Sequence, residues 1–135
     1  MNTKPVLSRD DVNRVAAAAI QEALSNRWAV TIAIVDDGGH LLWLQRLDGA
    51  APISAEIAPA KARTAAVGRR ESKVYEDMIN QGRTSFLSAP ALLGMLEGGV
   101  PILVAGQCVG AVGVSGVKSS EDAQIARAGI AALGG

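Results

Sequence analysis

Cysteine and histidine are nearly absent from this chain, which has Cys108 as its single cysteine and His40 as its single histidine. One cysteine excludes an internal disulfide and is typical of a reducing compartment. Because a structural zinc site needs several Cys or His ligands, the sequence predicts no zinc centre. His40 gains interest because the chain offers so few other soft or titrating groups.

Aromatic residues make up 3% of the chain, and charge of one sign never dominates. The apolar stretches are all shorter than the ~20 residues that a membrane-spanning helix needs. Residues 1–11 are polar and charged, unlike a signal peptide. Thirteen basic residues balance thirteen acidic ones, and the longest basic run is the pair Arg69-Arg70. We therefore expect a cytoplasmic protein that binds neither membranes nor nucleic acids.

The N-terminal part of the chain has a helical pattern followed by a strand pattern. Ser8 precedes two carboxylates and predicts a capped helix that ends near Asn26. Residues 29–35 alternate between a bulky face, which contains Ile32 and Ile34, and a face of small residues. We expect the first helix to lie against the small-residue face.

A strong turn signal follows at residues 36–39, so residues 40–47 are predicted to fold back as a hairpin partner. The next helical pattern runs over residues 54–67. Pro59 lacks a backbone N–H and disfavours helical geometry at the preceding residue, so the helix either starts at Pro59 or is kinked there. We favour the start at Pro59. Another helix is predicted over residues 71–80.

The stretch 98–116 predicts a second hairpin, with strands at residues 100–105 and 108–114 and a turn at Gly106-Gln107. The second strand has glycines three residues apart, at Gly110, Gly113 and Gly116. A bare backbone there admits the close approach of a packed helix, another subunit or a ligand.

The order of elements predicts the fold class. Residues 91–96 are assigned to a short helix or strand, and a capped helix that begins at Ser119 closes the chain. The order is therefore α-β-β-α-α-(β)-β-β-α, in which hairpins dominate and no βαβ unit occurs. We predict one α+β domain, 1–135, with an antiparallel sheet and helices packed on it.

Cations and hydroxyls gather around the end of the helix predicted over residues 54–67. Lys61 and Thr64 are three residues apart and share a face, and Arg69 and Arg70 follow the helix end. They form either a solvated stripe or a cationic wall that pairs with carboxylates.

Two further features carry alternative interpretations. His40 opens a strand beside a glycine turn, where a histidine is either a surface residue or a ligand. The loop Gly98-Gly99, followed by Val100 and Pro101, either forms a simple turn or presents backbone N–H groups to an anion.

Four segments resemble one known family. They are AVTIAIVDDGGHLLWLQRLDGA, IAPAKARTAA, GGVPILVAGQCVGAVGVSG and EDAQIARAGIAAL, and together they extend over nearly the whole chain. The chain is similar to the GlcG/HbpS family, whose domain also occurs at the C-terminus of PduO-type corrinoid adenosyltransferases. The resemblance implies a profilin-like or roadblock-like α+β domain with a five-stranded antiparallel sheet flanked by helices.

The resemblance also implies function and assembly. Family members typically form dimers and larger homo-oligomers, often octamers, and some bind haem or related tetrapyrroles. The adenosyltransferase chemistry of PduO belongs to its other domain and is not implied here. The family's motifs fall on these site residues: His40, Lys61, Thr64, Gly98, Gly99, Val100 and Pro101. Where the family commonly has an Arg-Pro-Thr-like sequence, this chain has Arg70-Glu71-Ser72. Ser72 therefore provides a hydroxyl at the position of the family's threonine, and an acid replaces the proline.

Haem binding by this chain must be non-covalent, because no CxxCH motif is present. The candidate axial ligands are His40, Cys108, Tyr75, Met78, Met95, and an oxygen of Thr64 or Ser72. Propionates are expected to meet Lys61, Arg69 and Arg70.

Two interpretations of function therefore stay open beside a purely structural scaffold. The first is an oligomer that binds a tetrapyrrole, with cations at the rim of the site and His40 or a neighbouring oxygen on the haem iron. The alternative is a small cytoplasmic enzyme, a lyase or isomerase of carboxylate or aromatic-acid catabolism. In it Lys61 and Arg70 hold the substrate carboxylate, and His40 or an acid such as Glu56 or Asp36 transfers protons.

Overall fold

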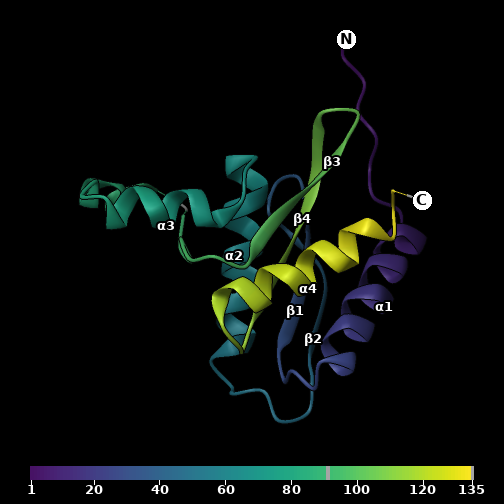
Figure 1. Cartoon of the computed structure of the whole chain (residues 1–135). Helices are drawn as coiled ribbons and strands as arrows, with labels where there is room; N and C mark the ends of the chain where they lie inside the picture. The colour runs from purple at the N-terminus through teal and green to yellow at the C-terminus, as the bar shows by residue number, and fades with distance from the viewer. Residues whose placement is uncertain (91, 135) are drawn as a thin grey trace.

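The computed structural model describes residues 1–90 and 92–134, with helices and strands close to the predicted order (Figure 1). Within them the elements are α1 (Arg9–Ser25), β1 (Thr31–Asp36), β2 (Leu41–Arg46), α2 (Ser54–Gly68), α3 (Ser72–Asn80), the 3-10 helix η1 (Thr84–Ser88), β3 (Gly99–Val104), β4 (Gln107–Ser115) and α4 (Ser119–Ala131). Ser8 caps α1 as predicted, accepting a hydrogen bond from the Asp11 N–H at 3.1 Å.

The strands form an antiparallel sheet in the order β2-β1-β4-β3. This confirms the predicted α+β class with an antiparallel sheet. The expectation of five strands is wrong for the described residues, in which the sheet has four. Residues 92–96 contain no strand, and Ala91, where the predicted extra element begins, lies outside the described residues. The profilin-like and roadblock-like names stay predictions.

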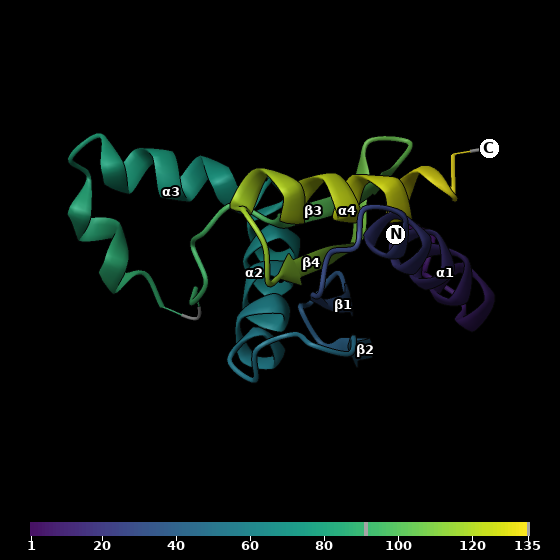
Figure 2. The same ribbon diagram turned by 60° about the horizontal axis from the view of Figure 1, so that its bottom comes forward.

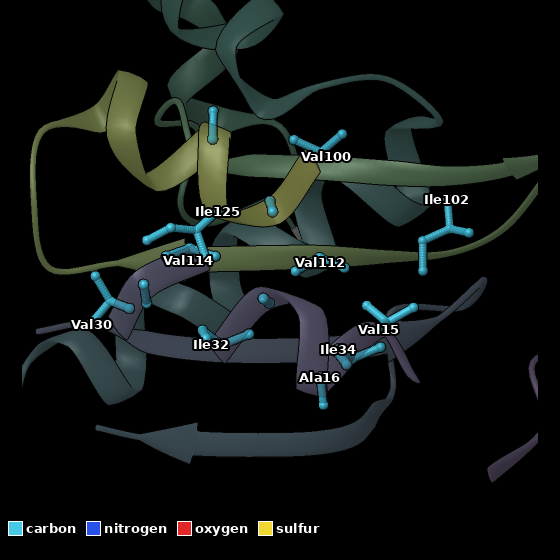
Figure 3. Close-up of a cluster of buried hydrophobic side chains, with 14 of the residues drawn as sticks. Val15, Ala16, Val30, Ile32, Ile34, Val100, Ile102, Val112, Val114 and Ile125 are labelled. Carbon is cyan, nitrogen blue, oxygen red and sulfur yellow. The ribbon is translucent and has the colours of Figure 1, made fainter. Parts of the chain in front are cut away.

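Helices α1 and α4 cover one face of the sheet, and α2 covers the other (Figures 1 and 2). The larger core lies under α1 and α4, where Val15 and Ile125 meet Ile32 and Ile34 of β1 (Figure 3). The first helix therefore packs on the bulky face, and the expectation that it lies against the small-residue face is wrong. Large side chains fill the space between two helices and the sheet better than alanines do.

The small-residue face belongs to α2, whose alanines lie directly on the sheet. Ala62, Ala65 and Ala66 of α2 form a second buried cluster with Val35 and Ala111 of the strands. A Cβ added to Gly113 of β4 would lie 2.1 Å from the carbonyl oxygen of Ala58. The predicted close approach at this glycine is therefore confirmed, and the approaching element is a helix of the same chain.

Helix α2 starts at Ser54, five residues earlier than expected, and includes Pro59. The first turn forms upstream of the proline, since the Glu56 and Ile57 N–H groups both donate to the Ile53 carbonyl at 3.0 Å. The Ser54 hydroxyl also contacts that of Thr31 at 2.7 Å and so fixes the helix start to β1. These tertiary contacts outweigh the preference of proline for the first helical turn.

The β3–β4 turn is Ala105-Gly106, one residue before the predicted Gly106-Gln107. Both residues have positive φ, 51° and 78°, as a two-residue type I′ turn requires. Glycine occupies the second position, and Ala105 tolerates the first.

Helix α3 and η1 project from the body of the molecule beside the end of α2, and we call residues 70–90 and 92–96 the arm (Figures 1 and 2). Its apolar side chains are only partly covered, with Leu87 64% and Leu93 77% exposed. No helix in the described residues has the length and apolarity to cross a membrane.

Candidate functional site

His40 lies in the β1–β2 turn, where the carboxylate of Asp36 organises the backbone and the imidazole together. Asp36 Oδ1 accepts hydrogen bonds from the Gly38 and His40 N–H groups, both at 2.9 Å. The same oxygen lies 3.2 Å from His40 Nδ1. When Nδ1 carries the proton it donates to Asp36, and the Nε2 lone pair then faces away from the carboxylate. The His40 side chain is 77% exposed, so Nε2 is open to a ligand.

Two cations hold this turn against the rest of the protein. Arg63 Nη1 of α2 donates to the Gly38 carbonyl at 3.4 Å. Lys4 Nζ pairs with Asp37 Oδ2 at 2.7 Å. The hydrogen bond from Lys4 lowers the pKa of the Asp37 carboxyl, although burial opposes the effect. The N-terminal segment and α2 therefore both contact the turn that carries His40.

A groove of about 400 Å³ adjoins the N-terminal segment. Residues on its walls include Thr3, Lys4, Arg69, Leu103, Gln107 and Cys108. Because Lys4 both lines the groove and pairs with Asp37, the groove lies close to the His40 turn. Arg69 adds a second cation, from the end of α2. The combination suits an anionic ligand.

Cys108 is the buried small side chain that its place in an interior strand predicts. It is 6% exposed, and its Sγ donates to the Gly110 carbonyl at 3.4 Å and to that of Ala66 at 3.6 Å. The thiol is therefore engaged within the protein.

Lys61 is neither on a solvated stripe nor on a cationic wall, because its side chain points into the protein. Only 3% of the residue is exposed, and Nζ donates to Asp122 Oδ2 of α4 and to the Val114 carbonyl of β4, both at 3.0 Å. Asp122 also accepts from the Val117 N–H at 3.2 Å. Burial raises the pKa of the Asp122 carboxyl, while the Lys61 ammonium opposes this shift. The Lys61 amine is thus engaged inside the fold.

Ser72 and Thr64 use their hydroxyls to fix the base of the arm. The Gly99 N–H donates to Ser72 Oγ at 2.8 Å, and Ser72 Oγ donates to the Leu96 carbonyl. Thr64 Oγ1 donates to the Leu93 carbonyl at 2.7 Å. The Gly99 N–H, considered from the sequence as an anion donor, is therefore already satisfied by Ser72.

The predicted site residues consequently divide into two groups. Lys61, Thr64, Ser72, Gly98 and Gly99 meet in the interior, where Val100 is buried and Pro101 half-buried. His40, Arg69 and Arg70 are exposed, and Arg70 places its guanidinium 5.6 Å from the Tyr75 ring centre. The structure thus does not bring Lys61 and His40 to one solvent-facing cavity. The enzyme interpretation, which needs Lys61 on a substrate carboxylate, is not favoured.

Sequence reasoning missed three residues that shape these groups: Asp36 as the anchor of the imidazole, Arg63 beside the same turn, and Asp122 as the partner of Lys61. The Asp36-x-x-x-His40 spacing across a glycine turn was a usable signal for the first. Nothing local indicates that Lys61 meets a residue 61 positions away. The described residues contain no cluster of three or more His, Cys, Asp or Glu side chains suited to a metal ion.

Known proteins are similar to this chain over most of its length. A family model described as Haem degrading protein HbpS-like matches residues 7–131. The chain is 58% identical over 115 residues to Protein GlcG of Escherichia coli strain K12, covering 85% of each chain. It is 33% identical to the crystal structure of HbpS, with a TM-score of 0.89 and coverage of 100% of this chain and 95% of that one.

A second solved structure is a PduOC:heme complex, 27% identical to this chain, with a TM-score of 0.87 and coverage of 95% of each chain. The agreement extends from the first helix to the last, so it concerns the whole domain and not an isolated motif. On this evidence the chain belongs to the HbpS-like family.

Proposed function

We propose that this protein binds haem or a related tetrapyrrole non-covalently and that His40 is the axial ligand. The observation that carries the proposal is the contact of 3.2 Å between His40 Nδ1 and Asp36 on an otherwise exposed imidazole. Metal-ligating histidines usually donate their second ring N–H to a carboxylate, which fixes the tautomer and leaves Nε2 for the metal. The related PduOC:heme complex supports the class of ligand.

The other candidate axial ligands are less suited to an external group. Cys108, Tyr75 and Met95 are 6%, 6% and 8% exposed, so each has to leave the interior before it meets a porphyrin. The hydroxyls of Thr64 and Ser72 are buried and donate to backbone carbonyls. Met78 is half-buried on α3. Accessibility and a free lone pair together favour His40.

The residues around His40 fit a haem with its carboxylates. A bound haem iron supplies a Lewis-acidic, redox-active centre. Asp36 holds the imidazole in one tautomer and orientation, and Arg63 and Lys4 keep the turn in place. Arg69 offers a guanidinium, which pairs readily with carboxylates, beside the groove.

Hemin titration, followed through the Soret band, tests the proposal. Wild-type protein is expected to give a saturable shift near one equivalent per subunit. His40→Ala should lose the part of the shift that depends on the axial ligand, and added imidazole should restore it. Met95→Leu is the matched control, because it removes another candidate ligand and should leave the spectrum unchanged. An unaltered spectrum in His40→Ala would show that the axial assignment is wrong.

We also propose that the chain assembles into a homo-oligomer built from dimers, with an octamer as the expected size. Exposed apolar side chains lie on the edge strand β2 and on the arm: Leu41, Leu42, Leu44, Val74, Leu87, Leu93 and Leu96. Such surface is typical of contacts between subunits. Light scattering after size exclusion should give a multiple of the 13.8 kDa chain mass. Leu93→Ser should lower the mass, whereas a wild-type monomer would contradict the proposal.

We further propose that the protein is cytoplasmic. The unpaired thiol of Cys108 is typical of a reducing compartment. Cell fractionation with compartment markers tests it, and recovery of the protein outside the cytoplasmic fraction would contradict it.

A further inference from the structure

A groove of about 320 Å³ opens between the C-terminal end of α1 and the last residues of β2. Its walls include Leu24, Arg27, Trp28, Arg46, Leu47 and Asp48. His40 lies just before the first residue of β2, and the six residues of this strand extend over about 20 Å. The groove is therefore separate from the His40 turn. Its volume lies at the lower end of the range for pockets that bind small molecules, roughly 300–1,000 Å³.

Arg27 reaches the groove from a backbone position that normally belongs to glycine. The Trp28 N–H donates to the Ala23 carbonyl at 2.9 Å. The Arg27 N–H donates to the Leu24 carbonyl at 3.1 Å, and the two bonds close a Schellman motif at the end of α1. Arg27 has a φ of 58° in this motif, where a side chain is strained. An arginine therefore stands at the groove at a cost to the stability of the helix end.

Arg27 and Arg46 present free donors to the groove. Both residues are exposed, and in the described part of the chain neither guanidinium forms a hydrogen bond or an ion pair. Asp48, on the same walls, is also exposed and pairs with neither of them. Two guanidinium groups beside one carboxylate leave the groove with an excess of positive charge. Because the planar fork of a guanidinium matches a carboxylate, this excess favours an organic acid.

An apolar wall completes the groove. Trp28 and Leu47 are half-buried and pack against the larger core, so both side chains are held in place. Leu24 of α1 lines the same groove and is 60% exposed. An indole held in this way offers its ring to a flat apolar group. The walls thus combine two cations with a fixed aromatic surface.

We propose that this groove binds a small monocarboxylate with a flat apolar body. Arg27 and Arg46 are the binding residues for the carboxylate, and Trp28 contacts the apolar body. Asp48 disfavours a second negative charge on the ligand, because like charges repel. The inference goes beyond the proposed haem site, since the groove is formed by other residues.

Tryptophan fluorescence tests the proposal directly, because Trp28 lies on the groove. The chain has one other tryptophan, Trp43, and a Trp43→Phe background assigns the signal to Trp28. Benzoate is the probe, and its addition should change the fluorescence saturably. Benzamide has the same shape without the charge, and acetate has the charge without the ring. Each should bind at least about tenfold more weakly than benzoate.

Two substitutions in this background should weaken the binding of benzoate alone. Arg27→Gly and Arg46→Gln should each raise the Kd of benzoate by about tenfold, the loss expected for a charge-assisted hydrogen bond, and leave that of benzamide unchanged. Arg27→Gly should also raise the urea midpoint by relieving the positive φ, so its loss of affinity cannot come from misfolding. Asp48→Asn should lower the Kd of benzoate by about threefold. Arg9→Gln, the matched control, removes an exposed cation from the other end of α1 and should change neither Kd.

An unsaturated response to benzoate, or equal Kd values for benzoate and benzamide, would overturn the inference. Unchanged benzoate affinity in both arginine variants would overturn it as well. Hemin titration of the same variants should match wild type, so a failure at this groove leaves the proposed function standing. A loss of hemin binding in these variants would instead contradict a separate site.

Discussion

Removing one member of the buried Lys61–Asp122 pair should destabilise the protein far more than removing both. The two side chains are 3% and 2% exposed and meet at 3.0 Å. Lys61→Met keeps the apolar stem but leaves a carboxylate without its ammonium, and Asp122→Leu leaves the ammonium with the Val114 carbonyl alone. Such orphaned buried charges cost about 3–5 kcal/mol, a large fraction of the roughly 5–15 kcal/mol that stabilises a domain.

The double variant Lys61→Met/Asp122→Leu should regain most of this loss. Replacing a buried ion pair by apolar side chains of similar volume is often neutral or stabilising. The double variant still loses the hydrogen bond that the Val117 N–H donates to Asp122, so we expect it within about 2 kcal/mol of wild type, and the two sites couple by several kcal/mol. Urea unfolding, followed by circular dichroism at one fixed protein concentration, measures the cycle. A double variant that loses the sum of the two single losses would refute the reasoning.

The same pair predicts how stability depends on pH. Because burial raises the pKa of the Asp122 carboxyl above its ordinary value of 3.8, the folded protein keeps this proton to a higher pH than the unfolded chain. Its contribution to stability is therefore complete below pH 3.8 and is lost as the pH rises through the raised pKa. The difference in free energy of unfolding between wild type and Asp122→Asn should fall over that window and then level off. A rise over the same window would contradict the account.

Three further substitutions test the packing around the sheet and the arm, each by urea unfolding. Gly113→Ala should destabilise by about 3 kcal/mol, because its Cβ would lie 2.1 Å from a backbone oxygen of α2; a wild-type midpoint would contradict the close packing. Arg27→Gly should stabilise by about 1 kcal/mol, since φ is 58° there, and destabilisation would refute that reasoning. Ser72→Ala should cost about 1–3 kcal/mol by orphaning the Gly99 N–H, whereas the exposed control Ser120→Ala should change stability by less than about 0.5 kcal/mol.

Local patterns predicted most of the elements but not how they pack. The Ser8 cap, the hairpins and the order of helices could be predicted because capping, turn chemistry and alternation act over a few residues. The face of β1 on which α1 packs could not be predicted, because it depends on which helix has the smaller side chains at its contact with the sheet. The start of α2 was misplaced because the contact between Ser54 and Thr31 joins residues 23 positions apart.

The candidate site shows the same division. His40 and the arginines at the end of α2 are exposed, so their position in the sequence was a fair guide to their accessibility. The burial of Lys61 could not be predicted in this way. A lysine on a helix is expected to be solvated unless a buried acid lies opposite, and Asp122 of the last helix supplies that acid. The contact between the Tyr75 and Phe86 rings also escaped notice, since it forms only when η1 packs against α3.

Binding of hemin through His40 is the central claim, and a titration of wild-type protein against His40→Ala tests it most directly. Wild type should give a saturable Soret shift near one equivalent per subunit. His40→Ala should lose the part of this shift that depends on the axial ligand and recover it when imidazole is added. A linear, unsaturated partition of hemin that is identical in the two proteins would contradict it.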